Sequence, residues 1–480
     1  MKIAAVTAEY NPFHDGHAYH LQKTREAGAT HIVAVMSGSV VQRGDFAVYD
    51  KFTRAEAAIA GGADLVIELP AAWACASAPR FASGAAQLIQ ALGVVDAVSF
   101  GCESGDAAAI ACAAACAASP AVAEAARPLL QAGLTYPAAL HRALAGLHPE
   151  AAALLSRPNN LLAAEYQKAC RALGFAPEWI AVRRQGAAHD APAAKDGTAA
   201  GDSSADGARN RAVFSEAPLI PAGAAHDAPF GGSSSDVSPA SMSAAWDDAA
   251  SVHGTQDSRA SAQCLPHTAE PAAPRLDASS GPTGGREAPF FACARAIRRQ
   301  LADGISPEQL LPNAACYRGC QLSGGIAALE QALLYRLRTA DGPLPIPDRA
   351  DGLADRLAAA ARQATSLSEL TELTRTKRYT AARVRRALLH ALLGVTDKSY
   401  TPIPYLRVLA ANSRGLQILS AAKGRAALPI GSSLSRLAAQ SEQARQYAAF
   451  EARVSDIYAL TLPRPGRCGW DQTRKFTPYD

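Results

Sequence analysis

Short apolar runs alternate with amphipathic stretches over the first 190 residues of this chain. Runs such as IAAV at 3–6 and HIVAVM at 31–36 have the length of buried strands, and apolar residues recur at helical spacing between such runs. Strands separated by helices predict a parallel sheet with right-handed crossovers. We predict strands at 3–6, 30–36, 64–69, 95–100 and 179–183, and helices at 18–27, 53–60, 81–92 and from 159 onward.

The last part of the chain follows a helical period instead. Helices are predicted at 290–304, 326–338, 352–364, 367–373, 381–393, 405–411 and 434–460. The fold class that follows is α/β. A parallel-sheet domain spans 1–190, residues 289–305 return to it, and a mainly α-helical domain spans 306–480.

Composition changes abruptly between these two parts. Residues 191–288 are mostly Ala, Gly, Ser, Pro and Asp, and such a segment buries too little apolar surface to offset the entropy lost on ordering. We therefore predict a disordered insertion. The heptapeptide GAAHDAP occurs at 186–192 and again at 223–229, and two copies do not indicate a solenoid.

Overall charge does not point to a partner. The chain has 47 Lys and Arg against 43 Asp and Glu, a net charge of +4, so a nucleic-acid surface would have to come from local clustering. The ten cysteines are scattered. The C-x-x-x-C pairs at 112–116 and 316–320 lack a second Cys or His pair, so we predict no zinc or other protein-bound metal.

Polar residues interrupt the N-terminal apolar run too early for a signal peptide, at Glu9, Asn11 and Pro12. The alanine-rich run at 107–123 contains Ser119-Pro120, which favours a surface helix over a membrane span. We expect a cytoplasmic protein with no membrane association.

An H-x-G-H tetrapeptide made by His14, Gly16 and His17 stands where the first strand should meet the first helix. Ligands of open α/β sheets bind beyond the carboxyl ends of the strands, where the following helix offers free N–H groups. Gly16 allows close approach to the backbone, and both imidazoles can donate hydrogen bonds to phosphate oxygens as charge develops. The surrounding E-Y-N-P-F-H and Y-H-L make a chance occurrence improbable, so this segment predicts a nucleotide site.

Other polar residues follow predicted strands or begin helices on the same side. Arg184 ends a strand, and Arg298 and Arg299 begin the helix after the insertion, where guanidinium groups suit phosphates but also suit a solvated surface. Gln42, Arg43, Asp50 and Lys51 follow another strand. They form either an acceptor or carboxylate pocket, or an ordered loop that docks on the sheet.

The densest basic segment runs from Arg375 to His390. Arg383, Arg386 and His390 share one helical face, and Tyr379 adds an aromatic platform among the cations. Cations with an interleaved aromatic suit folded RNA, although a solvated helix has the same composition. The predicted tRNA-binding residues are Arg375, Lys377, Arg378, Arg383, Arg385 and Arg386.

Several motifs together resemble the tRNA(Met) cytidine acetate ligase family. They are EYNPFH-x-GH-x-YH, MSG-x-x-x-QRG, GADLVIELP, Phe100-Gly101-x-Glu103, PNN-x-L, R-x-G-x-x-HD, the AIR helix start and TKRYT-x-x-R-x-RR-x-LLH. They occur in order and cover nearly the whole chain outside the insertion. The resemblance implies a HIGH-type nucleotidyltransferase domain and an α-helical tRNA-binding region.

The activity implied by the resemblance is that of an ATP-dependent ligase. It would activate acetate as acetyl-adenylate and acetylate the exocyclic amine of the wobble cytidine in elongator tRNA(Met), with Mg²⁺ carried by the triphosphate. The catalytic residues would be His14 and His17. The ATP-binding residues would be Thr7, Ala8, Glu9, Tyr10, Asn11, Pro12, Phe13, His14, Asp15, Gly16, His17, Ala18, Tyr19, His20, Gly101, Asn159, Asn160, Arg184 and Arg298.

Some positions depart from the family pattern. Ser39 stands where Asn is expected, Cys102 where Ser is expected, and Cys293 and Arg295 replace a serine and a threonine that could donate to phosphate. Either His189 or His226 could fill the family His-Asp position, and continuity with Arg184 favours His189. Two alternatives therefore stay open: a small-molecule adenylyltransferase of the same fold, and a tRNA-binding protein whose catalytic site has decayed.

Overall fold

The computed structural model describes residues 1–185 and 292–480, except positions 133, 135, 343, 348–351, 377, 475, 477 and 480. The described residues belong to one compact unit. The predicted insertion at 191–288, Lys377, His189 and His226 all lie outside the described residues.

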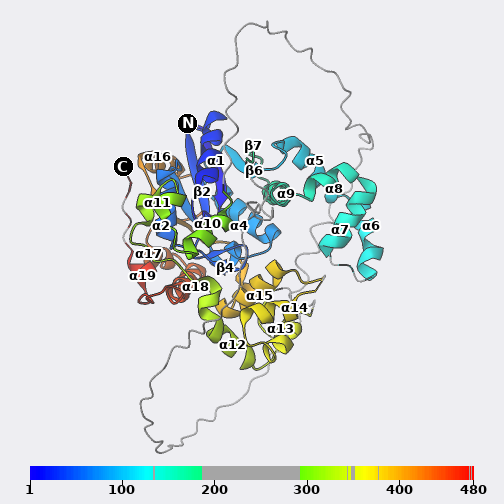
Figure 1. Ribbon diagram of the computed structural model, residues 1–480. Helices are drawn as coiled ribbons and strands as arrows, with labels where there is room; N and C mark the ends of the chain where they lie inside the picture. The colour runs from blue at the N-terminus through cyan, green and yellow to red at the C-terminus, as the bar shows by residue number, and fades with distance from the viewer. Residues whose placement is uncertain are drawn as a thin grey trace, which may run out of the picture. The chain divides into compact units, whose positions relative to one another are not determined.

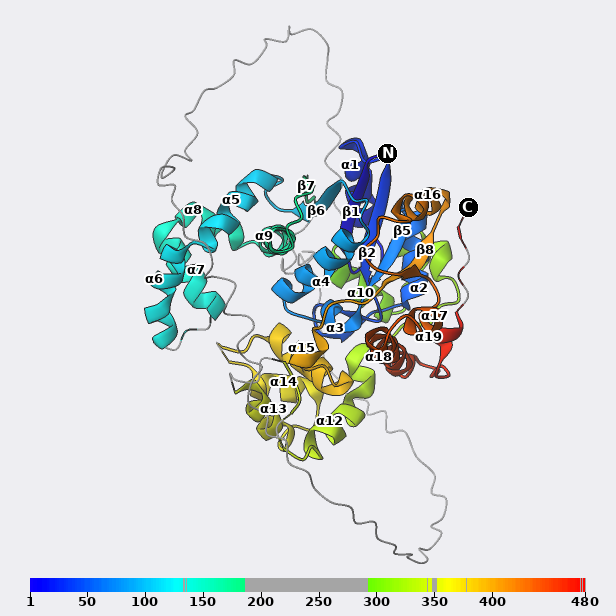
Figure 2. The same ribbon diagram turned by 180° about the vertical axis from the view of Figure 1, so that it is seen from behind.

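The described strands form one mostly parallel sheet in the order β7-β6-β1-β2-β5-β8-β9 (Figures 1 and 2). Only β8 is antiparallel to its neighbour β5 among these pairings. A small hairpin, β3 with β4, follows β2. The strands are β1 (Ile3–Ala8), β2 (His31–Ser37), β3 (Val40–Val41), β4 (Asp45–Phe46), β5 (Leu65–Leu69), β6 (Ala97–Cys102), β7 (Glu178–Arg183), β8 (Leu406–Ala411) and β9 (Ile430–Gly431).

The helices of the first part cover the sheet or extend from its β6 side. They are α1 (Asp15–Glu26), α2 (Lys51–Ala60), α3 (Ala71–Ala74), α4 (Ala78–Ala91), α5 (Ala107–Ala117), α6 (Pro120–Gln131), α7 (Tyr136–Leu147), α8 (Pro149–Leu155) and α9 (Pro158–Ala172). Helices α5 to α8 pack against one another, and α9 packs on α4.

After the undescribed segment the chain is mostly helical. The helices are α10 (Ala294–Ala302), α11 (Pro307–Leu310), α12 (Glu330–Arg338), α13 (Leu353–Ala361), α14 (Leu367–Thr374), α15 (Ala381–Leu393), α16 (Ser413–Ala422), α17 (Leu434–Ala438), α18 (Glu442–Ala459) and α19 (Trp470–Thr473). Short 3₁₀ turns are η2 (Ala314–Tyr317), η3 (Gly325–Leu329) and η5 (Asp397–Ser399). Helices α12 to α15 group together in both views (Figures 1 and 2).

Both faces of the central strands are buried, as their uninterrupted apolar sequences require. Side chains alternate along a strand, so Val33 and Val35 pack on one face with residues of α4, while Ile32 and Ala34 pack on the other with α1, α2 and α10. The predicted strands and helices of the first 183 residues are all present, with ends shifted by a few residues. The α/β fold class is confirmed.

One predicted helix is wrong. Residues 405–411 form strand β8, which pairs with β5 through Leu65 with Ala411 and Val66 with Ala410. A short apolar run such as YLRVLAA has no periodicity that separates a strand from a buried helix, and the free edge of β5 decided the outcome. The predicted helix at 434–460 is also two helices, because the Ser441 side chain caps a new helix start by accepting from Ala444 N. The predicted domain boundaries stay predictions.

Within the described residues, no single helix has the length and apolar composition of a membrane span. Helices α5 and α6 meet these criteria only as a pair, which is bent by 56°.

A buried group of charges ties the C-terminal part to the sheet. Lys51 is fully buried and its Nζ lies 2.6 Å from Glu68 Oε1 and 2.7 Å from Asp471 Oδ2. Arg407 contacts the same two carboxylates at 3.0 and 2.6 Å. Each buried charge therefore has a partner, which burial in a medium of low polarity requires.

Candidate active site

A cavity of about 320 Å³ opens beyond the carboxyl ends of β1, β6 and β7. This is the edge where open α/β sheets bind ligands. Fourteen of the predicted ATP-binding residues line it: Thr7, Ala8, Glu9, Tyr10, Asn11, His14, Gly16, His17, Tyr19, His20, Gly101, Asn159, Arg184 and Arg298. The structure thus brings together residues from five separate segments of the chain.

The two histidines of the H-x-G-H motif begin helix α1 as reciprocal caps. His14 Nδ1 accepts from Gly16 N at 3.1 Å, and His17 Nδ1 accepts from His14 N at 3.3 Å. The two rings stack, with centroids 3.8 Å apart. Because Nδ1 of each ring accepts a hydrogen bond, each ring carries its proton on Nε2. The caps therefore set both imidazoles as donors at the N-terminus of α1.

Two aromatic side chains of the 7–20 segment, those of Phe13 and Tyr10, pack against the His17 ring. The Phe13 side chain is fully buried, its ring lies 5.7 Å from that of His17, and Phe13 N donates to Tyr317 Oη at 3.1 Å. The Tyr10 ring meets His17 edge-on at 4.9 Å. Pro12, Phe13, Asp15 and Ala18 do not line the cavity.

His20 lies on the next turn of α1 and faces Ser99 of β6. Its Nε2 lies 3.0 Å from Ser99 Oγ. Burial, together with the positive charge of Arg184, lowers the pKa of His20 to about 4. His20 is therefore neutral at physiological pH.

The Asn159-Asn160 pair divides into two roles. Asn159 lines the cavity, whereas the buried Asn160 side chain accepts from Glu103 N at 2.9 Å and donates to Leu154 O at 2.9 Å. Glu103 in turn accepts from the backbone N of both asparagines at the start of α9. Asn160 is thus part of the scaffold that holds Asn159, and it does not line the cavity.

Four arginines line the cavity: Arg43, Arg183, Arg184 and Arg298. Burial lowers the pKa of Arg184 and of Arg298, and the charge of Arg43 lowers both further. Arg298 is anchored by donation from Nη1 to Asn11 O at 2.7 Å. The mutual repulsion of these cations favours an anion bound in the cavity. Arg299 is exposed and does not line the cavity.

The segment after β2 was predicted to form either an acceptor or carboxylate pocket or an ordered loop docked on the sheet. Its polar residues divide between the cavity and other contacts. Gln42 and Arg43 line the cavity. Asp50 instead caps α2 by accepting from Phe52 N and Thr53 N, and Lys51 belongs to the buried group of charges described above. Gln42 and Arg43 thus lie at the cavity, whereas Asp50 and Lys51 have structural contacts away from it.

Sequence reasoning missed the residue that holds the strand ends in place. Arg54 is fully buried and donates to Tyr49 O at 2.9 Å, to Glu9 O at 2.6 Å and to the carbonyls of Ser37 and Gly38. It also missed the apolar wall from α4 and α9, which includes Phe81, Leu162 and Tyr166. A lone arginine in a helix and ordinary apolar residues carry no local signal of these roles.

The departures from the family pattern affect the cavity unequally. Cys293 lines it, whereas Arg295 is exposed and does not, so Arg295 offers no replacement phosphate donor there. Cys102 is buried, and its Sγ accepts from Gly105 N at 3.3 Å. Ser39 is also buried, 3.4 Å from Ser455 Oγ.

The basic segment has an exposed side and a buried side. Arg385 is exposed, and Arg378 and Arg383 lie over the Tyr379 ring, each guanidinium 5.7 Å from its centroid. His390 is buried with Nε2 3.0 Å from Cys75 O, and burial lowers its pKa to about 4. His390 is close enough to Arg386 to feel its charge, as expected for one helical face, but this end of the face is buried near Cys75.

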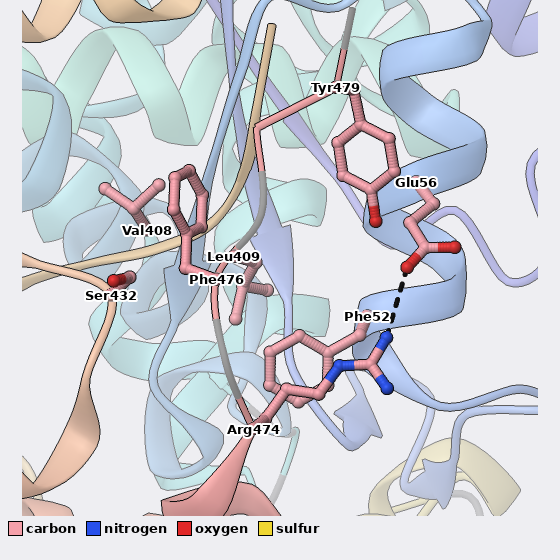
Figure 3. A pocket seen from close by; sticks show the side chains of 8 residues that line it. All are labelled: Phe52, Glu56, Val408, Leu409, Ser432, Arg474, Phe476 and Tyr479. Carbon is pink, nitrogen blue, oxygen red and sulfur yellow. Dashed lines mark hydrogen bonds and ion pairs between the residues drawn. The ribbon is translucent and has the colours of Figure 1, made fainter.

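A second cavity, of about 370 Å³, lies between α2, β8 and the C-terminal residues (Figure 3). Glu56 and Arg474 form an ion pair across it at 3.2 Å, and the Arg474 guanidinium lies 5.2 Å from the Phe52 ring centroid. Tyr479 N donates to Ala411 O at 2.9 Å. These contacts hold the C-terminal segment against the sheet edge.

Comparisons with known proteins agree with this geometry. A family model described as HIGH Nucleotidyl Transferase matches residues 1–228 and 283–469. A tRNA(Met) cytidine acetate ligase of Syntrophotalea carbinolica is 32% identical over 99% of this chain and 97% of its own length. The chain belongs to the tRNA(Met) cytidine acetate ligase family of HIGH nucleotidyltransferases.

Further relatives extend the match over the whole length. The tRNA(Met) cytidine acetate ligase of Syntrophomonas wolfei is 28% identical, with full coverage of both chains. Two structures of Thermotoga maritima TmcAL, one bound with alpha-thio ATP and one apo, cover both chains fully at 24% identity with TM-scores of 0.71 and 0.73. They share the fold of this chain. The family carries the descriptions ligase, ATP-binding and tRNA modification.

Proposed function

We propose that this protein uses ATP to activate acetate as acetyl-adenylate and then acetylates the exocyclic amine of the wobble cytidine in elongator tRNA(Met). The observation that carries the proposal is the convergence of His14, His17, Arg184 and Arg298 on one cavity at the carboxyl edge of the sheet. The names of the relatives, and the alpha-thio ATP bound to the Thermotoga maritima protein, support the choice of substrates.

In the first step, an acetate oxygen attacks the α-phosphorus of ATP and pyrophosphate leaves. The Nε2–H groups of His14 and His17 stabilise the charge that develops on the phosphoryl oxygens. The N-terminus of α1 adds its dipole, and Arg43, Arg184 and Arg298 neutralise the phosphates. Acetate is already ionised at neutral pH, so this step needs no general base.

Magnesium fits this site as an ion carried by the nucleotide. Glu9 is the only acidic residue among the described residues that line the cavity, so the protein offers no cage of carboxylates. The ion would be held by phosphate oxygens and water, and it would supply positive charge to the triphosphate.

In the second step, the cytidine amine attacks the carbonyl carbon of acetyl-adenylate and AMP leaves. We assign tRNA binding to Arg375, Lys377, Arg378, Arg383, Arg385 and Arg386. Among those that the structure describes, Arg375, Arg378 and Arg385 are exposed. Tyr379 packs against two of the cations, Arg378 and Arg383. The hairpin β3–β4 supports this assignment because it reaches from the cavity to α15.

The deciding experiment is mass spectrometry of elongator tRNA(Met) incubated with the protein, ATP and isotope-labelled acetate. We expect one labelled acetyl group on the wobble cytidine, dependent on both ATP and acetate. A stable adenylylated product formed without tRNA would favour a small-molecule adenylyltransferase. Absence of ATP binding by calorimetry would favour a tRNA-binding protein without catalysis.

A further inference from the structure

A carboxylate in a cavity suited to a triphosphate calls for a chemical explanation. Glu9 lies at the end of β1 and is the only acidic residue among the described residues lining the cavity. Its negative charge repels the phosphates, and the arginines that line the cavity already supply the attraction that the phosphates need. Glu9 therefore contributes something other than phosphate binding.

The structure fixes the orientation of this carboxylate. Glu9 Oε1 accepts from the backbone N of Gln42 at 2.7 Å, and Glu9 O accepts from the buried Arg54 at 2.6 Å. In the part of the chain that is described, no hydrogen bond reaches Glu9 Oε2. One oxygen thus anchors the group, and the other is left for a ligand in the cavity.

Gln42, which holds the Glu9 carboxylate, belongs to the segment that connects the cavity with the basic helix α15. Two residues beyond Gln42, the backbone of Gly44 packs directly on that of Arg385 and Arg386 in α15. The Asp45 carboxylate then accepts from Ile326 N at 2.7 Å and lies in the electrostatic field of both Arg298 and Arg385. A nucleotide delivered from α15 would therefore meet the cavity beside Glu9 and Gln42.

The imidazoles of the cavity and its two buried phenols are poorly suited to accept a proton. Each imidazole of the H-x-G-H motif uses its unprotonated nitrogen for a backbone hydrogen bond. His20 is buried against Ser99. Burial raises the pKa of Tyr10 and Tyr166 well above the usual range, so both phenols stay protonated.

We propose that Glu9 is the general base of acetyl transfer, which accepts the proton of the cytidine amine through Oε2. This inference rests on the function proposed above. The amine lone pair forms the N–C bond to the acetyl carbon, and the bond from that carbon to the bridging phosphate oxygen breaks. The electron pair leaves with AMP, the amine proton passes to Glu9, and the resulting carboxylic acid returns the proton to water.

The test separates the two half-reactions in the full-length protein. Acetate-dependent exchange of labelled pyrophosphate into ATP reports activation, and single-turnover transfer from preformed enzyme-bound acetyl-adenylate to tRNA reports the second step. We expect Glu9→Gln to keep exchange within about threefold of wild type and to slow transfer by about 10² to 10⁴-fold, the range of general-base catalysis. The control Glu26→Gln changes an exposed glutamate of α1 and should leave both rates unchanged.

Other results would overturn the assignment. Equal loss of both half-reactions, or a raised Mg²⁺ requirement for exchange, would show that Glu9 serves the nucleotide, and equal retention of both would show that it has no chemical role. If Glu9→Gln does not fold, Glu9→Asp is the second variant, because it keeps a carboxylate but shortens the side chain. Slowed acetyl transfer with intact pyrophosphate exchange would support Glu9 as the general base. Equal loss of transfer and exchange would contradict that role. Absence of acetyl transfer by the wild-type protein would instead refute the proposed function itself.

Discussion

Gly44 of the β3–β4 hairpin and Arg386 of helix α15 meet backbone to backbone. A Cβ atom added at Gly44 would lie 2.4 Å from Arg386 N. The two residues before Gly44 line the predicted nucleotide cavity, and α15 carries the predicted tRNA-binding residues. This contact therefore connects the predicted nucleotide cavity with the helix that carries the predicted tRNA-binding residues.

Replacing Gly44 with alanine should destabilise the fold through two separate effects. The left-handed backbone at φ +79° costs about 1–2 kcal/mol for any residue with a Cβ, and the overlap with α15 adds roughly 1–3 kcal/mol. Gly424→Ala is a matched control, because Gly424 has the same φ of +79° and nothing within 4 Å of the added atom. Equal unfolding free energies for the two variants in urea would show that the hairpin does not pack on α15.

His17→Ala should strongly slow the activation of acetate and leave tRNA binding nearly unchanged. Loss of one donor to the developing phosphoryl charge typically costs about 10²–10³-fold, so acetate-dependent ATP–pyrophosphate exchange should fall by that factor. The affinity for tRNA, measured by filter binding, should stay within about twofold. His141→Ala, at an exposed position of α7, is the control and should exchange like wild type. Preserved exchange in His17→Ala would refute the assigned role.

Arg385→Gln should weaken tRNA binding and leave the activation of acetate unchanged. Arg385 is exposed on α15, so its loss should weaken tRNA binding by roughly 3- to 10-fold and lower the slope of log affinity against log salt by about 0.7–0.9 for each lost phosphate contact. Exchange without tRNA should be unchanged. Arg436→Gln removes an exposed arginine of α17 and should leave the salt slope as it is. An unchanged slope in Arg385→Gln would place the tRNA elsewhere.

Glu451 makes stability depend on pH in a direction that can be checked. Burial, reinforced by the charge of Glu68, raises the pKa of Glu451 to about 8, although Lys51 opposes the shift. The folded protein thus holds a proton that the unfolded chain releases near pH 4.5, so this group's stabilisation is complete below that pH and is lost as pH rises toward 8. Its Oε1 accepts from Ala71 N at 2.8 Å.

Glu451→Gln keeps a neutral acceptor for Ala71 and removes the titration. Its stability relative to wild type should therefore rise between about pH 5 and 8 and level off above, by roughly 1–3 kcal/mol. Urea unfolding at several pH values measures this difference. Glu150→Gln, exposed on α8, should follow the wild-type slope. A constant difference between Glu451→Gln and wild type across this range would show that Glu451 is ionised throughout.

The sequence by itself determined the parallel strands of the first 183 residues and the position of the H-x-G-H turn. Buried parallel strands are continuous apolar runs, and the N-cap of a helix is a local arrangement, so both leave a signal within a few neighbouring residues. The same locality explains why His14, His17 and Arg184 could be proposed together, since the two histidines stand at a helix start and Arg184 follows a strand end.

Only the tertiary structure decided what depends on contacts between distant segments. YLRVLAA became strand β8 because β5 offered an open edge, Lys51 met Asp471 from 420 positions away, and His390 turned inward against Cys75. Spacing along a chain does not show which of two polar residues is buried. From the sequence alone, Gln42 and Lys51 were therefore equally good candidates for the pocket, and only the packed structure distinguished them. Burial and partner choice are properties of the assembled core, whereas capping and strand periodicity are properties of the local chain.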